Sequence, residues 1–210
     1  MFFPIFTTIL IVFGLFSVYM KTSNKKIQNS GEDLWKRELE ANRVRRRPLD
    51  DLNMVKLDLS ALPIDEDTDD EEIRDYQDKL KVLEKKEISN LSDYTNTDLK
   101  FKYGPANLEK LTELDQNFME LVRVLYQWAH YMYEKGEKEK CIRILEYGVS
   151  IHTDVKAHYK LLADIYAADF DFEAIKRITE EAKKTESPTR DSIVEMLEST
   201  DYFRPQEVHL

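Results

Sequence analysis

An uncharged apolar stretch opens the sequence and constrains where the rest of the chain can fold. Residues 2–20, FFPIFTTILIVFGLFSVYM, contain no Lys, Arg, Asp or Glu. As a helix rising about 1.5 Å per residue, this stretch reaches roughly 28 Å, close to the hydrocarbon thickness of a bilayer. It has neither the basic start nor the small-residue exit of a cleaved signal peptide. The sequence therefore predicts a retained transmembrane helix over residues 1–20.

The basic residues after this stretch predict its orientation. Lys21, Lys25 and Lys26 follow it directly, and no Lys or Arg precedes it. The positive-inside rule then places the short N-terminus outside and the bulk of the chain in the cytoplasm, as a single-pass membrane protein. The Lys- and Asp-rich composition favours a bacterial inner membrane, and an organelle surface is the open alternative.

Charge changes sign along the next segment, residues 21–69. Nine basic and four acidic side chains lie between Lys21 and Arg47, whereas residues 65–72 read DEDTDDEE. Because a basic residue near an anionic membrane surface contributes about 1 kcal/mol, we expect lipid contact here. The residues expected at the membrane surface are Lys25, Lys26, Arg43, Arg45, Arg46 and Arg47. Pairing with the acidic block, or a role in topology alone, are the alternatives.

Nucleic acid is not an expected partner. The net charge is −10, which opposes phosphate binding. The arginines near residue 45 are also not interleaved with the aromatic or glycine residues typical of nucleic-acid binders.

Two local patterns occupy the juxtamembrane segment. From Ser30 to Arg46 a capping serine, an acidic first turn and a following Pro48 predict a helix that docks through Trp35. From Val55 to Leu59 apolar and polar residues alternate, which predicts an extended strand-like segment with one buried face. Since no second strand is evident, we expect this segment to lie along the helical domain, followed by a solvated acidic linker.

Helical periodicity dominates residues 70–200, and only five Gly and six Pro in 210 residues favour an all-α fold. Apolar residues from Ile73 to Leu83 recur at spacings of 3, 4 and 3, which predicts an amphipathic helix over residues 70–86. After a break rich in Asn, Ser and Thr, we expect a short helix over residues 106–114. A long helix should follow, capped by Asp115 and ended by Gly136.

Two stretches in the second half of the chain share one pattern. VLYQWAHYMYEKGEKEKCIRI (residues 124–144) and HYKLLADIYAADFDFEAIKRI (residues 158–178) both place large and small side chains in a fixed order around a charged turn. Small residues let neighbouring helices approach, and large ones fill the gaps between them. The first pattern is formed by Leu125, Trp128, Ala129, Met132, Cys141, Leu145 and Gly148, and the second by Tyr159, Leu162, Ala163, Tyr166, Ile175, Thr179 and Ala182.

This pattern resembles the tetratricopeptide repeat, a 34-residue helix–turn–helix unit. The resemblance implies a helical-hairpin array over residues 70–200, with repeats at about 122–155 and 156–189 and capping helices at its ends. Ser187 and Pro188 should start the last capping helix, residues 188–199, and residues 201–210 form a tail. Phe170 stands where a turn glycine is usual, and Thr153 replaces the usual proline between repeats. A generic α-helical hairpin bundle is the alternative.

The resemblance also implies a binding face, since members of this family hold ligands against the first helix of each repeat. Carried over position by position, the groove residues are Arg123, Tyr126, His130, Tyr133, Lys160 and Asp164. The Lys, Asn and Arg set that grips a C-terminal carboxylate in some members is largely missing here. We therefore expect an extended peptide from a protein partner, or self-occupancy by Val55–Leu62 or by the tail.

No catalytic signature is present. The chain lacks a P-loop, G-x-G-x-x-G, H-E-x-x-H and a nucleophile elbow, so no enzyme and no cofactor are expected. The single Cys141 excludes a disulfide framework and a multi-cysteine zinc site. At a packing position it should be a buried, inert thiol.

The function expected from the sequence is therefore that of a single-pass membrane-anchored adaptor or scaffold. It would bind protein partners at the cytoplasmic face of the membrane. The alternative is an accessory subunit of an integral membrane complex, held through its transmembrane and juxtamembrane helices, with a structural role for the helical domain.

Overall fold

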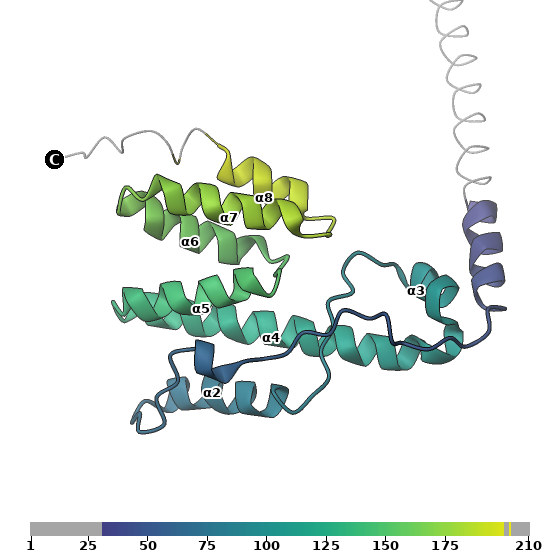
Figure 1. The fold of residues 1–210 in the computed structure, drawn as a ribbon, viewed down its shortest axis with the longest axis horizontal. Coiled ribbons are helices and arrows are strands. Elements are labelled where there is room, and N and C mark those ends of the chain that lie inside the picture. Colours follow the sequence, from purple (N-terminus) through teal and green to yellow (C-terminus); the bar gives the residue numbers. More distant parts are fainter. Residues whose placement is uncertain (1–30, 200–201, 203–210) are drawn as a thin grey trace, which may run out of the picture. The chain divides into compact units, whose positions relative to one another are not determined.

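The computed structural model describes residues 31–199 and residue 202 (Figure 1). Over these residues the secondary structure is helical, with one isolated β-bridge and no strand, so the predicted all-α fold is confirmed. In the same residues, no helix is both long and apolar enough to cross a membrane. The expected transmembrane helix, together with Lys25 and Lys26, lies outside the described residues.

The chain divides into two compact units. The first unit combines the residues up to Arg47 with Asn96–Leu108, and the second unit combines Pro48–Thr95 with the residues from Glu109 onward.

The second unit is built from α-helices, and short connections join those that follow residue 108. Its helices are α2 (Glu71–Leu83), α4 (Leu108–Glu134, of which Leu108 belongs to the first unit), α5 (Lys138–Ser150), α6 (Lys156–Ala168), α7 (Phe172–Lys184) and α8 (Arg190–Leu197). In this stack α5 packs against α6 and α7, and α8 packs against both α6 and α7 (Figure 1). Asp70 caps α2 by accepting the backbone N–H groups of Glu72 and Ile73.

The bounds of the helices recur at the spacing of the sequence pattern. α5 begins at Lys138 and ends at Ser150, and both bounds of α7, Phe172 and Lys184, are offset from these by the same repeat length. The residues of the shared sequence pattern are all buried, Leu125 and Trp128 among them. Thr179, the polar member, donates its hydroxyl to the carbonyl of Ile175 at 2.7 Å. The pattern in the sequence thus corresponds to a repeated packing arrangement.

The turns within the two helix pairs have the same backbone geometry but different residues. Gly136, between α4 and α5, has a φ of 77°, and Phe170, between α6 and α7, has a φ of 59°. This left-handed region favours glycine, because a Cβ crowds the backbone there. Phe170 adopts it nonetheless, with 68% of its surface exposed and its ring edge-on to Phe172.

The extended segment at residues 53–62 packs on the helices of the second unit, as predicted. The Val55 N–H donates to the carbonyl of Ile88 at 2.8 Å, and Leu57 and Leu62 are buried in the core. The Asp58 N–H donates to the Tyr147 hydroxyl at 2.8 Å. A short 3₁₀ helix, η1 (Leu59–Ala61), ends the segment.

The side chain of Arg143 also holds this segment. It donates to the carbonyls of Ser60 and Ala61 at 3.0 and 2.7 Å. Arg143 and Tyr147 lie on α5, the second helix of its pair. These hydrogen bonds join the segment to the second helix of its pair, whereas the predicted groove residues lie on the first helices, so they do not support the alternative of self-occupancy by Val55–Leu62.

Helix α4 corrects two predicted boundaries. A separate helix over residues 106–114 and a start at Asp115 were expected, but one helix runs from Leu108 to Glu134. The sequence contains neither Gly nor Pro between these residues, so nothing interrupts the hydrogen-bond ladder. The Asp115 carboxylate instead accepts the backbone N–H of Leu91 at 3.1 Å.

Two other boundaries also differ from expectation. α8 begins at Arg190 rather than Pro188, because Ser187 uses its hydroxyl to accept the Thr189 N–H in a turn before the helix. The predicted break before α4 contains an additional helix, α3 (Asn96–Tyr103).

The first unit consists of a helix at residues 31–41, α3 and a 3₁₀ turn, η2 (Pro105–Asn107). The first of these ends at Ala41 rather than at the predicted Arg46. Glu38 on this helix accepts the hydroxyl of Thr97 at 2.7 Å and forms an ion pair with Lys100. Ala41, Leu99 and Tyr103 are buried.

Candidate protein-binding groove

A groove of about 890 Å³ lies beside α4 in the second unit. Its floor contains the buried side chains of Phe118 and Val122, and Met119 is 61% exposed beside them. We call this site the α4 groove. Its lining is Leu91, Ser92, Tyr94, Asp115, Gln116, Phe118, Met119, Glu120, Val122, Arg123, Tyr126, Asp154 and Val155.

The wall formed by residues 89–94 is fixed by hydrogen bonds to the rest of the second unit. The Ser89 N–H donates to the Leu114 carbonyl at 3.3 Å, and the Asn90 amide donates to the His152 carbonyl at 3.3 Å. Asn90 also accepts the N–H and the hydroxyl of Ser92, which makes a local Asx turn. This wall is therefore anchored both to α4 and to the connection between α5 and α6.

Carboxylates dominate the charge of the α4 groove. Glu120 forms an ion pair with Arg123, whereas neither Asp115 nor Asp154 has an ion-pair partner among residues 31–199 and 202. Burial raises the pKa of Asp115; the Leu91 N–H opposes this rise, and the charge of Asp154 adds to it. Asp115 and Asp154 are thus two like charges that line the same groove.

The structure divides the six predicted groove residues into three groups. Arg123 and Tyr126 line the α4 groove, and the Tyr126 ring stands edge-on to His158, with centroids 5.5 Å apart. His130 and Tyr133 are exposed further along α4 and are not part of its lining.

The remaining two predicted residues, on α6, form a separate cluster. Lys160 forms an ion pair with Asp164 at 2.6 Å. Asp164 also accepts the hydroxyl of Tyr202 at 3.1 Å, so the tail contacts this position.

Sequence reasoning missed most of the lining of the α4 groove. Leu91, Asp115 and Asp154 come from three separate parts of the chain, and no local pattern joins them. Met119 was detectable, because it is a large apolar residue outside the buried stripe of its helix.

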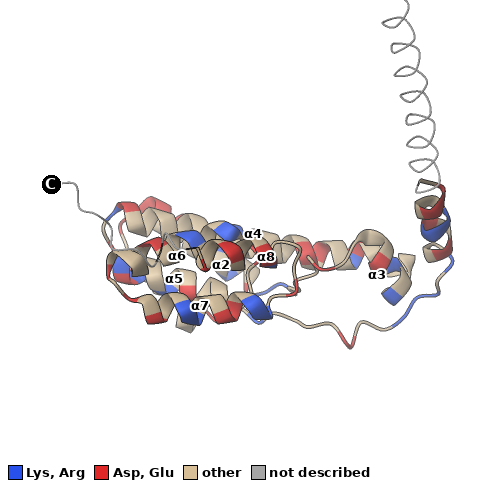
Figure 2. Cartoon of the chain, turned by 90° about the horizontal axis from the view of Figure 1, so that it is seen from above, with Lys and Arg blue, Asp and Glu red and all other residues tan. Residues whose placement is uncertain are grey.

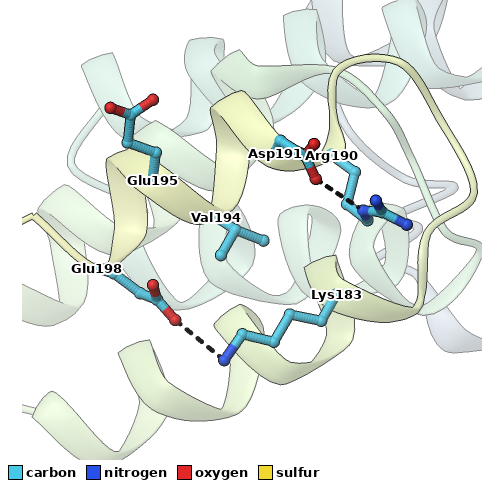
Figure 3. A pocket seen from close by; sticks show the side chains of 6 residues that line it. All are labelled: Lys183, Arg190, Asp191, Val194, Glu195 and Glu198. Atoms are coloured by element: carbon cyan, nitrogen blue, oxygen red, sulfur yellow. Dashed lines mark hydrogen bonds and ion pairs between the residues drawn. The ribbon is translucent and has the colours of Figure 1, made fainter.

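A second pocket, of about 480 Å³, is lined by α8 and the end of α7 (Figure 3). Five of its six lining side chains are charged, and Val194 is the exception. Lys183 pairs with Glu198 at 3.0 Å and Arg190 pairs with Asp191 at 3.0 Å, so these charges already satisfy one another (Figure 3). With little apolar surface to cover, this pocket is the weaker candidate.

The first unit presents an exposed apolar patch and an arginine segment. Leu34, Trp35 and Leu39 are exposed on the helix at residues 31–41, and Trp35 is 65% exposed. Figure 2 shows basic residues along the segment that follows this helix. Their side chains are exposed at Arg43, Arg45, Arg46 and Arg47, and none forms an ion pair within the described part of the chain.

The arginine segment is held in place by backbone hydrogen bonds and by the Arg46 side chain, whose Nε donates to Asn107 Oδ1 at 2.9 Å. The Arg47 N–H donates to the Tyr103 carbonyl at 3.0 Å, and Asn107 donates to the Arg47 carbonyl at 2.8 Å. Gly104 has a φ of 86°, and a Cβ there would lie 2.6 Å from the carbonyl oxygen of Arg45. The backbone is thus fixed while the arginine side chains remain exposed.

Groups with catalytic potential are buried or dispersed. Cys141 is fully buried, as predicted, and burial raises the pKa of its thiol to about 12. Among the described residues, no group of three or more His, Cys, Asp and Glu side chains is arranged to hold a metal ion.

Comparisons with models of protein families, with curated proteins and with solved structures find no match to this chain. Its function is therefore inferred from its own residues.

Proposed function

We propose that this protein is a membrane-anchored adaptor with a tetratricopeptide-like helical unit that binds a protein segment in the α4 groove. The observation that carries the proposal is the groove itself. The groove has a volume of about 890 Å³, part of its lining is apolar, including Phe118 and Val122, and Met119 is 61% exposed there. Exposed methionine is common on surfaces that bind peptides, since its unbranched side chain adapts to different partners.

Two features support the wider architecture. The recurring helix bounds and buried positions are those expected of a tetratricopeptide-like array. The uncharged residues 2–20, followed by Lys21, Lys25 and Lys26, support a single-pass anchor with the helical unit in the cytoplasm, as in a bacterial inner membrane.

The test compares three full-length proteins by proximity labelling and crosslinking mass spectrometry in native cells. Met119→Arg places a bulky charge in the α4 groove, and we expect it to remove the partners found with the unchanged protein. Tyr133→Ala, on the same helix but outside the groove lining, is the matched control and should keep them. Partners that persist with Met119→Arg would move the binding site elsewhere.

A second candidate function is favoured by the exposed Leu34, Trp35 and Leu39. An apolar helix face beside a membrane anchor suits packing against an integral membrane partner, which would make the protein an accessory subunit. Trp35→Ser should then release the protein from a complex that Met119→Arg leaves intact, as measured by native gel electrophoresis of solubilised membranes. Loss with Met119→Arg and not with Trp35→Ser favours the adaptor.

A further inference from the structure

We infer that the α4 groove selects a protein segment in which a Lys or Arg is adjacent to a large apolar side chain. This inference rests on the proposed function and adds the chemistry of the partner. It depends on where the carboxylates of the groove lie and on what already neutralises them.

The carboxylates that line the groove are the reason why the bound segment should carry a Lys or Arg. Three carboxylates line the groove, and Arg123 is the one basic residue in its lining. Because Arg123 already pairs with Glu120, the carboxylates of Asp115 and Asp154 are left without a cation in the described chain. A positive side chain placed between these two would relieve their mutual repulsion, whereas an anionic ligand would increase it.

Each of the two carboxylates accepts a hydrogen bond from another part of the second unit. Asp115 accepts the Leu91 N–H at 3.1 Å, and Asp154 accepts the Ser187 hydroxyl at 3.3 Å. Each carboxylate retains further acceptor capacity, since an ionised carboxylate has about four lone-pair sites. The groove therefore offers two preorganised acceptors to an incoming donor.

The apolar side chains at the floor of the groove are the reason why the bound segment should also carry a large apolar residue. Phe118 and Val122 are buried beneath the groove, and Met119, Tyr94 and Val155 complete its apolar surface. A small cation would leave this surface in water, and a nucleic acid would meet the negative wall. A peptide that joins a basic residue to a Leu, Ile, Phe or Trp satisfies both halves at once.

The first experiment selects binders from a displayed library of short random peptides, on full-length protein in detergent micelles. Peptides that bind the Met119→Arg variant equally well are removed, so that only groove-dependent sequences remain. We expect these to be enriched in Lys or Arg next to a large apolar residue. The strongest peptide is then synthesised together with a copy in which each Lys and Arg is replaced by Gln.

The second experiment measures the affinity of these two peptides. The Gln copy should bind about tenfold more weakly, and so should the basic peptide to the variant with Asp115→Asn and Asp154→Asn. Asparagine keeps an acceptor oxygen for the Leu91 N–H and the Ser187 hydroxyl, so the fold should be retained. The matched control is Glu173→Gln with Asp191→Asn, two exposed acids outside the groove, which should leave the affinity unchanged.

The outcomes distinguish a failure of the proposed function from a failure of the inferred ligand chemistry. If no selected peptide depends on Met119, the proposed function fails. If groove-dependent peptides show no basic enrichment, or bind the Gln copy and the Asn variant unchanged, the α4 groove binds segments but this inference is overturned. Because the Gln substitutions are made in the peptide, that result does not depend on the folding of a variant.

Discussion

The two helix pairs of the second unit, α4 with α5 and α6 with α7, follow one pattern but differ at a few positions. Where the first pair has Gly136 in its turn, the second has Phe170. Where the first pair buries Val124, the second buries His158 at the equivalent position of the pattern. The repeated positions thus specify helix packing, while the second pair contains a strained turn and a buried titratable group that the first pair lacks.

Replacing the central side chains of the two pairs should have the largest effect. Trp128 and the equivalent Leu162 are both fully buried. We expect Trp128→Ala to lower the free energy of unfolding by about 3–5 kcal/mol and Leu162→Ala by about 2–5 kcal/mol, because each leaves a cavity. Chemical denaturation followed by circular dichroism measures both. A negligible cost at either position would break the equivalence of the two pairs.

The buried histidine should make the second pair sensitive to acid. His158 is fully buried; burial lowers its pKa to about 4, and its Nδ1 lies 3.2 Å from the Thr153 hydroxyl. Below pH 6.5 the unfolded chain therefore takes up a proton that the folded chain does not. The free energy of unfolding is therefore unaffected by this residue's protonation above pH 6.5, and it falls by about 3 kcal/mol as the pH drops to about 4.

The control for this prediction comes from the other pair. His158→Val copies Val124 and removes the titrating group, so its free energy of unfolding should fall less between pH 7 and pH 4 than that of the unchanged protein. Equal pH dependence in the two proteins would show that His158 does not couple folding to pH.

The smallest effect is expected at the turns. Phe170→Gly should raise the free energy of unfolding by about 0.5–1 kcal/mol, because glycine adopts a positive φ without a Cβ clash. Gly136→Ala should lower it by about 1 kcal/mol for the same reason, although no neighbouring atom lies within 4 Å of the added carbon. Thermal unfolding of both variants measures these two changes in stability. Effects of the same sign would contradict the backbone explanation.

Sequence reasoning predicted the parts that depend on local periodicity. The small residues Ala129 and Ala163 and their large neighbours indicated the buried faces correctly, and the alternation at Val55–Leu59 indicated a segment packed on the helices. It failed at Asp115, a residue type that is common at helix starts, because α4 continues through this position and the carboxylate accepts the Leu91 N–H instead of capping a helix. The preference of Asp for the N-terminus of a helix is a weak signal that tertiary contacts can override.

The site was less predictable than the fold. The predicted residues Arg123 and Tyr126 do line the α4 groove, but Asp154 joins it from the connection between α5 and α6, which is distant in the sequence. The repulsion between Asp115 and Asp154 depends on their distance in space, which no single sequence pattern encodes.

The packing of residues 53–62 has a consequence for synthesis. The Asp58 N–H reaches Tyr147 across 89 positions of sequence, and the carbonyl of Ala61 reaches Arg143 across 82. These contacts cannot form until α5 has been translated, and such distant closures are slow compared with helix formation. Leu57 and Leu62 therefore lack their packing partners on α5 until the ribosome has synthesised that helix. The segment that is synthesised first in the second unit is thus among the last to pack.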